Sequence, residues 1–214
     1  MPTLENDHQA VIYRPDSHNF DSVIDAFNDR LLHIPYPTEA SALFDPIDYT
    51  LESGGKRIRP TLLLRMAMAC GADAMDAIAP AIGLELFHNF TLLHDDIMDK
   101  AEVRRGRPSV HCRWNDNVAI LSGDAMLTIA SGYMNGIPGE VGRRIFELFT
   151  KTALEIYQGQ QLDMEFEERN DVSVNEYIHM IRLKTSVLLG CACRIGAMLG
   201  KASDEACKAA YDFG

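Results

Sequence analysis

The chain has 214 residues, of which 47% are hydrophobic, and a formal net charge of −11 at pH 7. This length and composition predict one sizeable hydrophobic core rather than two domains, and the negative charge argues against nucleic acid as the main partner. The sequence shows neither the basic-then-apolar form of a signal peptide nor an uncharged apolar run of membrane-spanning length, so we expect no integral membrane segment.

The N-terminal quarter combines a polar arm with short helices. Residues 1–19 are polar and aperiodic, which predicts a flexible N-terminal arm. Helical spacing of apolar residues begins near Phe20 and breaks at two prolines after residue 34. Short helices are predicted over residues 40–51 and over residues 61–70, with a glycine turn between them.

Longer helical patterns fill the rest of the chain. They are predicted at residues 75–99, 115–135, 140–168, 173–199 and from about 203 onwards. Ser173 and Glu176 have the spacing of a capping box, which supports the start of the fourth of these helices. No segment alternates as a strand would, and the loops are short. The sequence therefore predicts a single all-α domain over residues 20–214, an antiparallel helical bundle.

Acidic side chains gather at the C-terminal end of the predicted helix over residues 75–99. Residues three and four apart share a helix face. This spacing places on one face of the helix His88, Thr91, Asp95 and Asp99, with Asp96 at its edge. Two carboxylates one turn apart at a helix C-terminus repel each other and the negative end of the helix dipole. A hard cation between Asp95 and Asp99 would offset this repulsion, and carboxylates with room for water suit Mg²⁺. The alternative is a solvated acidic helix end tied to the arginines that follow.

A cationic turn precedes the helix predicted at residue 61. Its sequence, Gly54-Gly55-Lys56-Arg57-Ile58-Arg59, does not match a P-loop, because Thr50 and Arg57 stand where that pattern needs glycine and Ser or Thr. The glycines still let backbone approach an anion, and Arg59 and Lys56 supply a planar fork and a point charge. Alone, such a segment is also typical of a basic surface turn. Together with the acidic helix end, it predicts two polyanionic groups held close together, one through metal and one directly by cations.

Two other features allow more than one interpretation. Lys184 lies in a mostly apolar helical segment, where a lysine is more often a surface residue with a buried stem. The five cysteines form no set with zinc-binding spacing, so we interpret them as reduced core thiols of a cytoplasmic protein.

The ordered motifs resemble the trans-prenyl diphosphate synthases of the farnesyl and geranylgeranyl diphosphate synthase group. The resemblance covers residues from about 40 to the end of the sequence. The matching segments are Gly54-Gly55-Lys56-Arg57-Ile58-Arg59-Pro60, His88, Asp95-Asp96-Ile97-Met98-Asp99, Arg104-Arg105-Gly106, Gly159-Gln160-Gln161-Leu162-Asp163 and Lys184-Thr185.

This resemblance implies a Mg²⁺-dependent prenyltransferase of isoprenoid biosynthesis, usually a homodimer, with a deep apolar pocket inside the helical bundle. Such an enzyme condenses isopentenyl diphosphate with an allylic diphosphate and releases diphosphate. By position, isopentenyl diphosphate would be bound by Lys56, Arg59, His88 and Arg105. Asp95 and Asp99 would hold Mg²⁺ against the allylic diphosphate. That diphosphate would also contact Arg104, Lys184, Thr185 and Gln160, and supporting roles would fall to Asp96 and Asp163.

The resemblance also bears on product length. In the family, bulk four and five residues before the first aspartate limits the growing chain, and these positions are Thr91 and Phe90. Helical geometry puts Phe90 roughly 140° from the catalytic face, so we expect Thr91 to be the floor. Its small side chain favours geranylgeranyl over farnesyl diphosphate as the product.

One departure concerns the end of the sequence. The family carries a second aspartate-rich motif shortly after a tract like Tyr211-Asp212-Phe213-Gly214, where this sequence stops. We therefore expect residues 1–214 to be the N-terminal part of such an enzyme and to be inactive alone. Two alternatives remain: a non-catalytic regulatory subunit of a heteromeric synthase, and a terpene cyclase, which would have no use for the cationic turn.

Overall fold

The computed structural model describes residue 16 and residues 19–214. The predicted arm over residues 1–19 lies largely outside these residues and stays a prediction. Asn19 is part of the fold, because its side chain accepts a hydrogen bond from the Asp21 backbone N–H (3.0 Å) and caps the first helix.

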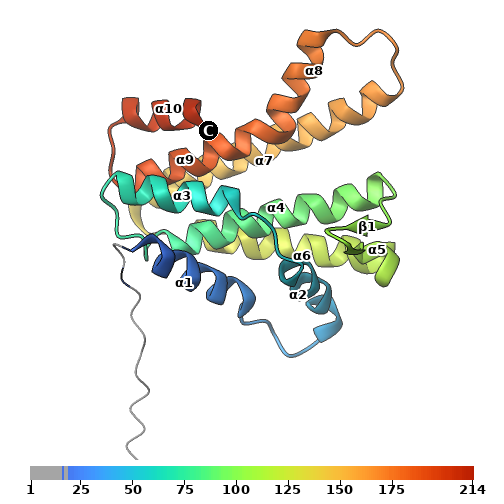
Figure 1. Ribbon diagram of the computed structural model, residues 1–214, viewed down its shortest axis with the longest axis horizontal. Helices are drawn as coiled ribbons and strands as arrows, with labels where there is room; N and C mark the ends of the chain where they lie inside the picture. Colours follow the sequence, from blue (N-terminus) through green and yellow to red (C-terminus); the bar gives the residue numbers. More distant parts are fainter. Residues whose placement is uncertain (1–15, 17–18) are drawn as a thin grey trace, which may run out of the picture.

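The described residues are almost entirely helical (Figure 1). The helices are α1 (Phe20–Leu32), α2 (Asp45–Glu52), α3 (Ile58–Ala69), α4 (Ile78–Met98), α5 (Val110–Arg113), α6 (Asp116–Asn135), α7 (Gly139–Glu167), α8 (Val174–Ile181), α9 (Val187–Leu199) and α10 (Asp204–Phe213). The prediction of an all-α fold is confirmed. In this part of the chain, no helix is both long and apolar enough to cross a membrane.

Several local features differ from the predicted elements: the helix predicted from residue 40 begins at Asp45, the one predicted from residue 75 begins at Ile78, and α5 was not predicted. A two-residue antiparallel hairpin, β1 (Val103–Arg104) with β2 (Arg107–Pro108), follows α4. Helix α3 begins three residues before the predicted start, because Pro60 falls in its first turn, where the missing N–H costs no hydrogen bond. The helix predicted from residue 173 does begin with a capping box at Ser173, but a π-helical turn, Arg182–Ser186, separates α8 from α9.

Helix α4 is the centre of the bundle. It packs along α6 and also contacts α3 and α1, while α9 lies between α3, α7 and α10 (Figure 1). Side chains on nearly every face of α4 are buried, which is the pattern of a helix surrounded by protein. This burial keeps the C-terminal half of α4 in place for the side chains that it presents near residue 95.

The cysteines are not all core residues. All five are free, and Cys191, Cys193 and Cys207 are buried as predicted. Cys112 is exposed, so the prediction of a core thiol is wrong there; the four-residue helix α5 turns this side chain to solvent.

We expect Gly196→Ala to destabilise the contact between α3 and α9. A Cβ at Gly196 would overlap the Leu63 carbonyl oxygen and lie 2.8 Å from the Ala67 nitrogen. Because these are backbone atoms, the free energy of unfolding should fall by about 1–3 kcal/mol. The control is Gly132→Ala on α6, where nothing lies within 4 Å, and where alanine should add up to about 1 kcal/mol. Urea denaturation measures both, and equal changes would contradict the prediction.

Candidate functional site

Cations from three elements surround one cavity at the start of α3. The cavity has a volume of about 210 Å³. Its lining consists of Lys56, Arg57, Ile58, Arg59, Glu85, His88 and Arg105. All four residues that the resemblance assigned to isopentenyl diphosphate, from the turn, α4 and the hairpin, therefore line the same cavity.

The cavity is held together by short polar contacts. Arg59 Nη1 lies 3.1 Å from His88 Nε2. The Arg105 guanidinium donates to the Gly54 carbonyl and lies 3.4 Å from Ser53 Oγ. It approaches this closely because Gly55 has no side chain; a Cβ there would lie 3.1 Å from the guanidinium carbon. The glycines of the turn thus let the hairpin arginine lie against the backbone.

His88 is an uncharged group among cations. Burial, followed by the charges of the neighbouring Arg59 and Arg105 guanidinium groups, lowers its pKa from 6.5 to about 3. Since Arg59 can only donate a hydrogen bond, Nε2 of His88 accepts and Nδ1 carries the proton. The imidazole can therefore offer one donor without adding to the repulsion between the arginines.

The three aspartates at the end of α4 have different surroundings. Asp96 is only 4% exposed and accepts from Arg104 of the hairpin, with Oδ1 at 2.7 Å from Nε and 2.6 Å from Nη2. Asp95 lies between two cations, with Arg104 Nη2 at 3.7 Å and Lys184 Nζ at 3.5 Å. Asp99 is exposed, and burial, followed by the charge of Asp95, raises its pKa.

Lys184 reaches across the helices to this acidic end. Its Nζ lies 2.6 Å from Asp163 Oδ2 on α7, so the interpretation as a solvated surface lysine is wrong. Close approach of α7 explains the contact: a Cβ at Gly159 would overlap the backbone nitrogen of Lys184 in the π-helical turn. Gln160, next in sequence, has its Nε2 3.8 Å from Met98 Sδ and so contacts the end of α4.

A second cavity, of about 190 Å³, lies between α4, α7 and the π-helical turn. It is lined by Arg59, His88, Phe90, Thr91, Leu92, His94, Asp95, Met98, Ile156, Tyr157, Gln160, Lys184, Thr185 and Leu188. Arg59 and His88 also line the cationic cavity, so the two are adjacent. Phe90 does not lie apart from Thr91, as the helical angles predicted, because both line this cavity. The Phe90 ring lies across from Tyr157 of α7, with ring centroids 6.3 Å apart.

Asp95 and Asp99 fit a partial metal site. Within the described residues, no three or more His, Cys, Asp or Glu side chains form a group that could hold a metal ion. Asp95 Oδ1 is nevertheless buried and accepts no hydrogen bond, with Lys184 Nζ beside it at 3.5 Å, which leaves this oxygen free to ligate a metal ion. Mg²⁺ commonly takes one or two carboxylates and completes its coordination with water and phosphate, so two aspartates are sufficient.

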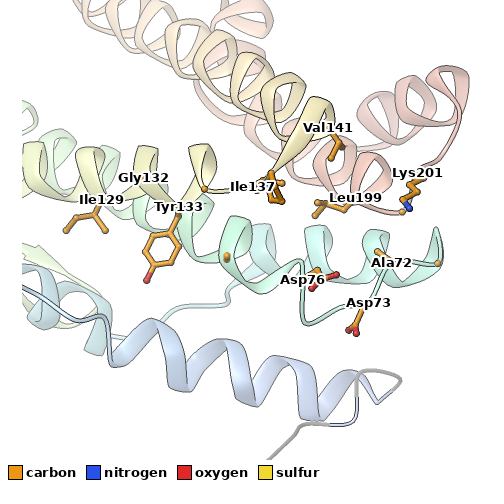
Figure 2. Close-up of a pocket in the computed structure, with 15 residues that line it drawn as sticks. Ala72, Asp73, Asp76, Ile129, Gly132, Tyr133, Ile137, Val141, Leu199 and Lys201 are labelled. Atoms are coloured by element: carbon orange, nitrogen blue, oxygen red, sulfur yellow. The ribbon is translucent and has the colours of Figure 1, made fainter.

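A larger cavity, of about 900 Å³, lies elsewhere, between the loop after α3 and the ends of α6 and α9 (Figure 2). Its charged side chains are Asp73, Asp76 and Lys201, and the rest of its lining is mainly apolar or glycine. None of the predicted site residues borders it. Size alone therefore does not mark the functional site of this protein.

Sequence reasoning missed the second set of residues around the cationic cavity. Glu85 is 2% and Asn89 0% exposed, and Glu85 Oε1 lies 2.5 Å from Arg57 Nη1. The signal was available, because Glu85 and Asn89 are polar residues four apart within an apolar helix. Their contacts could not be predicted from the sequence, because they depend on how the turn before α3 packs against α4.

Known proteins match most of the chain. A family model described as polyprenyl synthetase matches residues 40–214. The geranylgeranyl diphosphate synthase of Methanosarcina mazei is 42% identical over 198 residues, 92% of this chain and 60% of that protein. The geranylfarnesyl diphosphate synthase of Natronomonas pharaonis is 37% identical over 190 residues, 80% of this chain and 56% of that protein.

Solved structures agree with these relatives. The geranylgeranyl pyrophosphate synthetase from the archaeon Geoglobus acetivorans is 37% identical, has a TM-score of 0.85, and is matched over 91% of this chain and 64% of that one. The alignments with these proteins thus cover most of this chain but only part of the other protein. This chain spans 56% to 60% of the length of these two curated relatives.

We expect the His88 imidazole to stay neutral at every pH from about 5 to 8. With a pKa of about 3, the ring is protonated only in strong acid, since burial and the guanidinium groups disfavour its charged form. NMR titration of the histidine ring protons measures this, and the missing signal in His88→Gln identifies the resonance. A midpoint near the ordinary value of 6.5 would contradict it.

Proposed function

The chain belongs to the polyprenyl synthetase family, and we propose that it forms the substrate-binding part of a short-chain trans-prenyl diphosphate synthase. The proposed reaction condenses isopentenyl diphosphate with an allylic diphosphate, forms a geranylgeranyl or farnesyl diphosphate, and releases diphosphate. One observation carries this proposal: the cationic cavity shares Arg59 and His88 with the second cavity, which is called the acid-lined cavity below because Asp95 borders it. Two diphosphate esters bound there would have their hydrocarbon ends close together.

The cationic cavity is proposed to bind isopentenyl diphosphate without metal, through Lys56, Arg59, His88 and Arg105. Its lining contains three arginines and a lysine against the single carboxylate of Glu85. Guanidinium groups bind phosphate oxygens in pairs, and a neutral imidazole can add a donor. This balance of charges supports an anionic ligand held directly by side chains.

The acid-lined cavity is proposed to bind the allylic diphosphate. In this proposal Asp95 and Asp99 hold Mg²⁺, and the diphosphate also contacts Arg104, Lys184, Thr185 and Gln160. When bound, Mg²⁺ supplies positive charge that stabilises a departing diphosphate. Asp96 and Asp163 have supporting roles, since each pairs with a cation, Arg104 and Lys184 respectively, and fixes its direction.

The residues then divide the reaction between them. The allylic C–O bond breaks and leaves its electron pair on diphosphate, whose charge is stabilised by Arg104 and Lys184. The isopentenyl double bond attacks the allylic carbon, and the resulting cation loses a proton. Apolar side chains of the cavity, among them Phe90, Ile156 and Leu188, keep water from the cationic intermediates.

Product length is proposed to depend on both Phe90 and Thr91. Each lines the acid-lined cavity one or two turns before Asp95, where a growing hydrocarbon chain would extend. The small Thr91 leaves more depth than an aromatic residue would, and the Methanosarcina mazei relative is a geranylgeranyl diphosphate synthase. We therefore favour geranylgeranyl diphosphate as the product.

We also propose a cytoplasmic location and a homodimer, each from one feature of the chain. Five free cysteines support a reducing, cytoplasmic location. Ile120 and Leu121, 44% and 59% exposed on α6, support a homodimer that covers this helix. A purely regulatory subunit would not need the ion pair that holds Lys184 beside Asp95, and a terpene cyclase would not need the cationic cavity.

We expect residues 1–214 alone to be catalytically silent and to self-associate. Beyond Lys184 the acids are Asp204, Glu205 and Asp212, and Asp204 is paired with Arg144 (2.6 Å) rather than with the site. Without further acidic ligands for the metal, the departing diphosphate is less stabilised, and loss of one such electrostatic contact can already lower turnover by about 10²–10³. Exposed apolar side chains such as Leu154 (62%) and Ile178 (59%) favour association. Radiolabelled isopentenyl diphosphate incorporation with light scattering measures both; steady turnover by a monomer would contradict both.

We expect two separable binding sites. Arg59→Ala should weaken binding of isopentenyl diphosphate in EDTA about tenfold or more, because a charge-assisted contact contributes about 1.5–3 kcal/mol. Asp95→Asn should leave that binding unchanged and weaken Mg²⁺-dependent binding of geranyl diphosphate to a similar degree. Isothermal titration calorimetry measures the dissociation constants. If Asp95→Asn weakened both ligands equally, the division into two sites would be wrong.

A further inference from the structure

Among the residues that the structure describes, Glu85 is the only carboxylate in the lining of the cationic cavity. It is 2% exposed, and a buried carboxylate is unfavourable unless charges or hydrogen bonds compensate it. Its Oε1 receives both: Arg57 Nη1 lies at 2.5 Å and Asn89 Nδ2 at 3.0 Å. We propose that Glu85 is the positioning residue of this cavity, which sets Arg57 and, through Asn89, Arg105. The proposal rests on the proposed function in assigning a diphosphate to the cavity.

The first set of contacts, from Glu85 through Arg57, holds the glycine turn. Arg57 has a left-handed backbone (φ 47°), which is unfavourable for a residue with a side chain, and it lies directly before α3. Its guanidinium spans from Glu85 to the Leu51 carbonyl oxygen (2.7 Å) at the end of α2. Although Arg57 borders the cavity, its guanidinium is engaged by Glu85 and the Leu51 carbonyl, so it fixes the backbone between Lys56 and Arg59, which line the same cavity.

The second set of contacts leads from Glu85 through Asn89 to Arg105. Its Nδ2 group donates to the Glu85 backbone oxygen (2.8 Å) and to Oε1, so the side-chain oxygen is left facing Arg105 Nη1 at 3.4 Å. Arg105 also has a left-handed backbone (φ 52°). Asn89 therefore gives the Arg105 guanidinium a fixed acceptor on α4, and Glu85 determines which way the Asn89 amide points.

A positioning role and a purely electrostatic role predict opposite results. The Glu85 carboxylate offsets part of the repulsion between Arg59 and Arg105, whose pKa values burial lowers. If charge were all that mattered, Glu85→Gln would make the cavity more positive and diphosphate would bind more tightly. If Glu85 positions Arg57 and Asn89, the same variant loosens the turn and binding weakens.

The test is calorimetric titration of isopentenyl diphosphate into the protein in EDTA. We expect Glu85→Gln to weaken binding about tenfold, with Mg²⁺-dependent binding of geranyl diphosphate unchanged. The matched control is Glu52→Gln, which removes the same charge from an exposed position just before the turn and should leave the affinity unchanged. Arg57→Gln combined with Glu85→Gln should weaken binding by less than the product of the single effects.

Each outcome bears on the proposal. Unchanged or tighter binding by Glu85→Gln, with a normal circular dichroism spectrum, would overturn the positioning role while leaving the proposed function intact. No binding by the parent protein would overturn the diphosphate assignment and this inference with it. Should Glu85→Gln not fold, Asn89→Leu, which removes the contact with Arg105, carries the same expected loss of affinity.

Discussion

Like charges crowded at one end of α4 repel each other, and the arrangement depends on counter-charges that neighbouring elements supply to Asp95 and Asp96. Arg104 of the hairpin is paired with Asp96, and Lys184 of the π-helical turn with Asp163 of α7. In the cationic cavity the same role falls to Glu85. Because every pair joins different elements, the charges that gather a ligand also hold the helices together.

The hairpin after α4 directs two neighbouring arginines to different partners. Arg104 turns toward the buried Asp96, while the next residue, Arg105, turns toward the Gly54 carbonyl. Such a division needs a sharp change of direction between neighbouring residues, and the left-handed backbone of Arg105 and Gly106 provides it. A hairpin with two-residue strands is marginal by itself, so its conformation depends on the ion pair of Arg104 and the carbonyl contact of Arg105.

Local chemistry made most of the helices predictable, whereas the contacts between them were not. Ser173 caps α8 where expected, since an N-cap acts within three residues of itself. The partner of Lys184 lies 21 residues away on another helix, and no spacing rule reaches so far. The same holds for Phe90: angles around an isolated helix place it off the catalytic face, but the cavity extends around α4 because α7 contributes its other wall.

The π-helical turn at Arg182–Ser186 limits how this segment can vary in length. Removing one residue there would allow a regular α-helix and rotate α8 relative to α9 by about 100°. Lys184 could then no longer meet Asp163, and the backbone that lies against Gly159 would change its path. Single-residue deletions should therefore be selected against in this turn, while the exposed loop between α7 and α8 can change length freely. Across related sequences, gaps should collect in that loop and be absent from the turn.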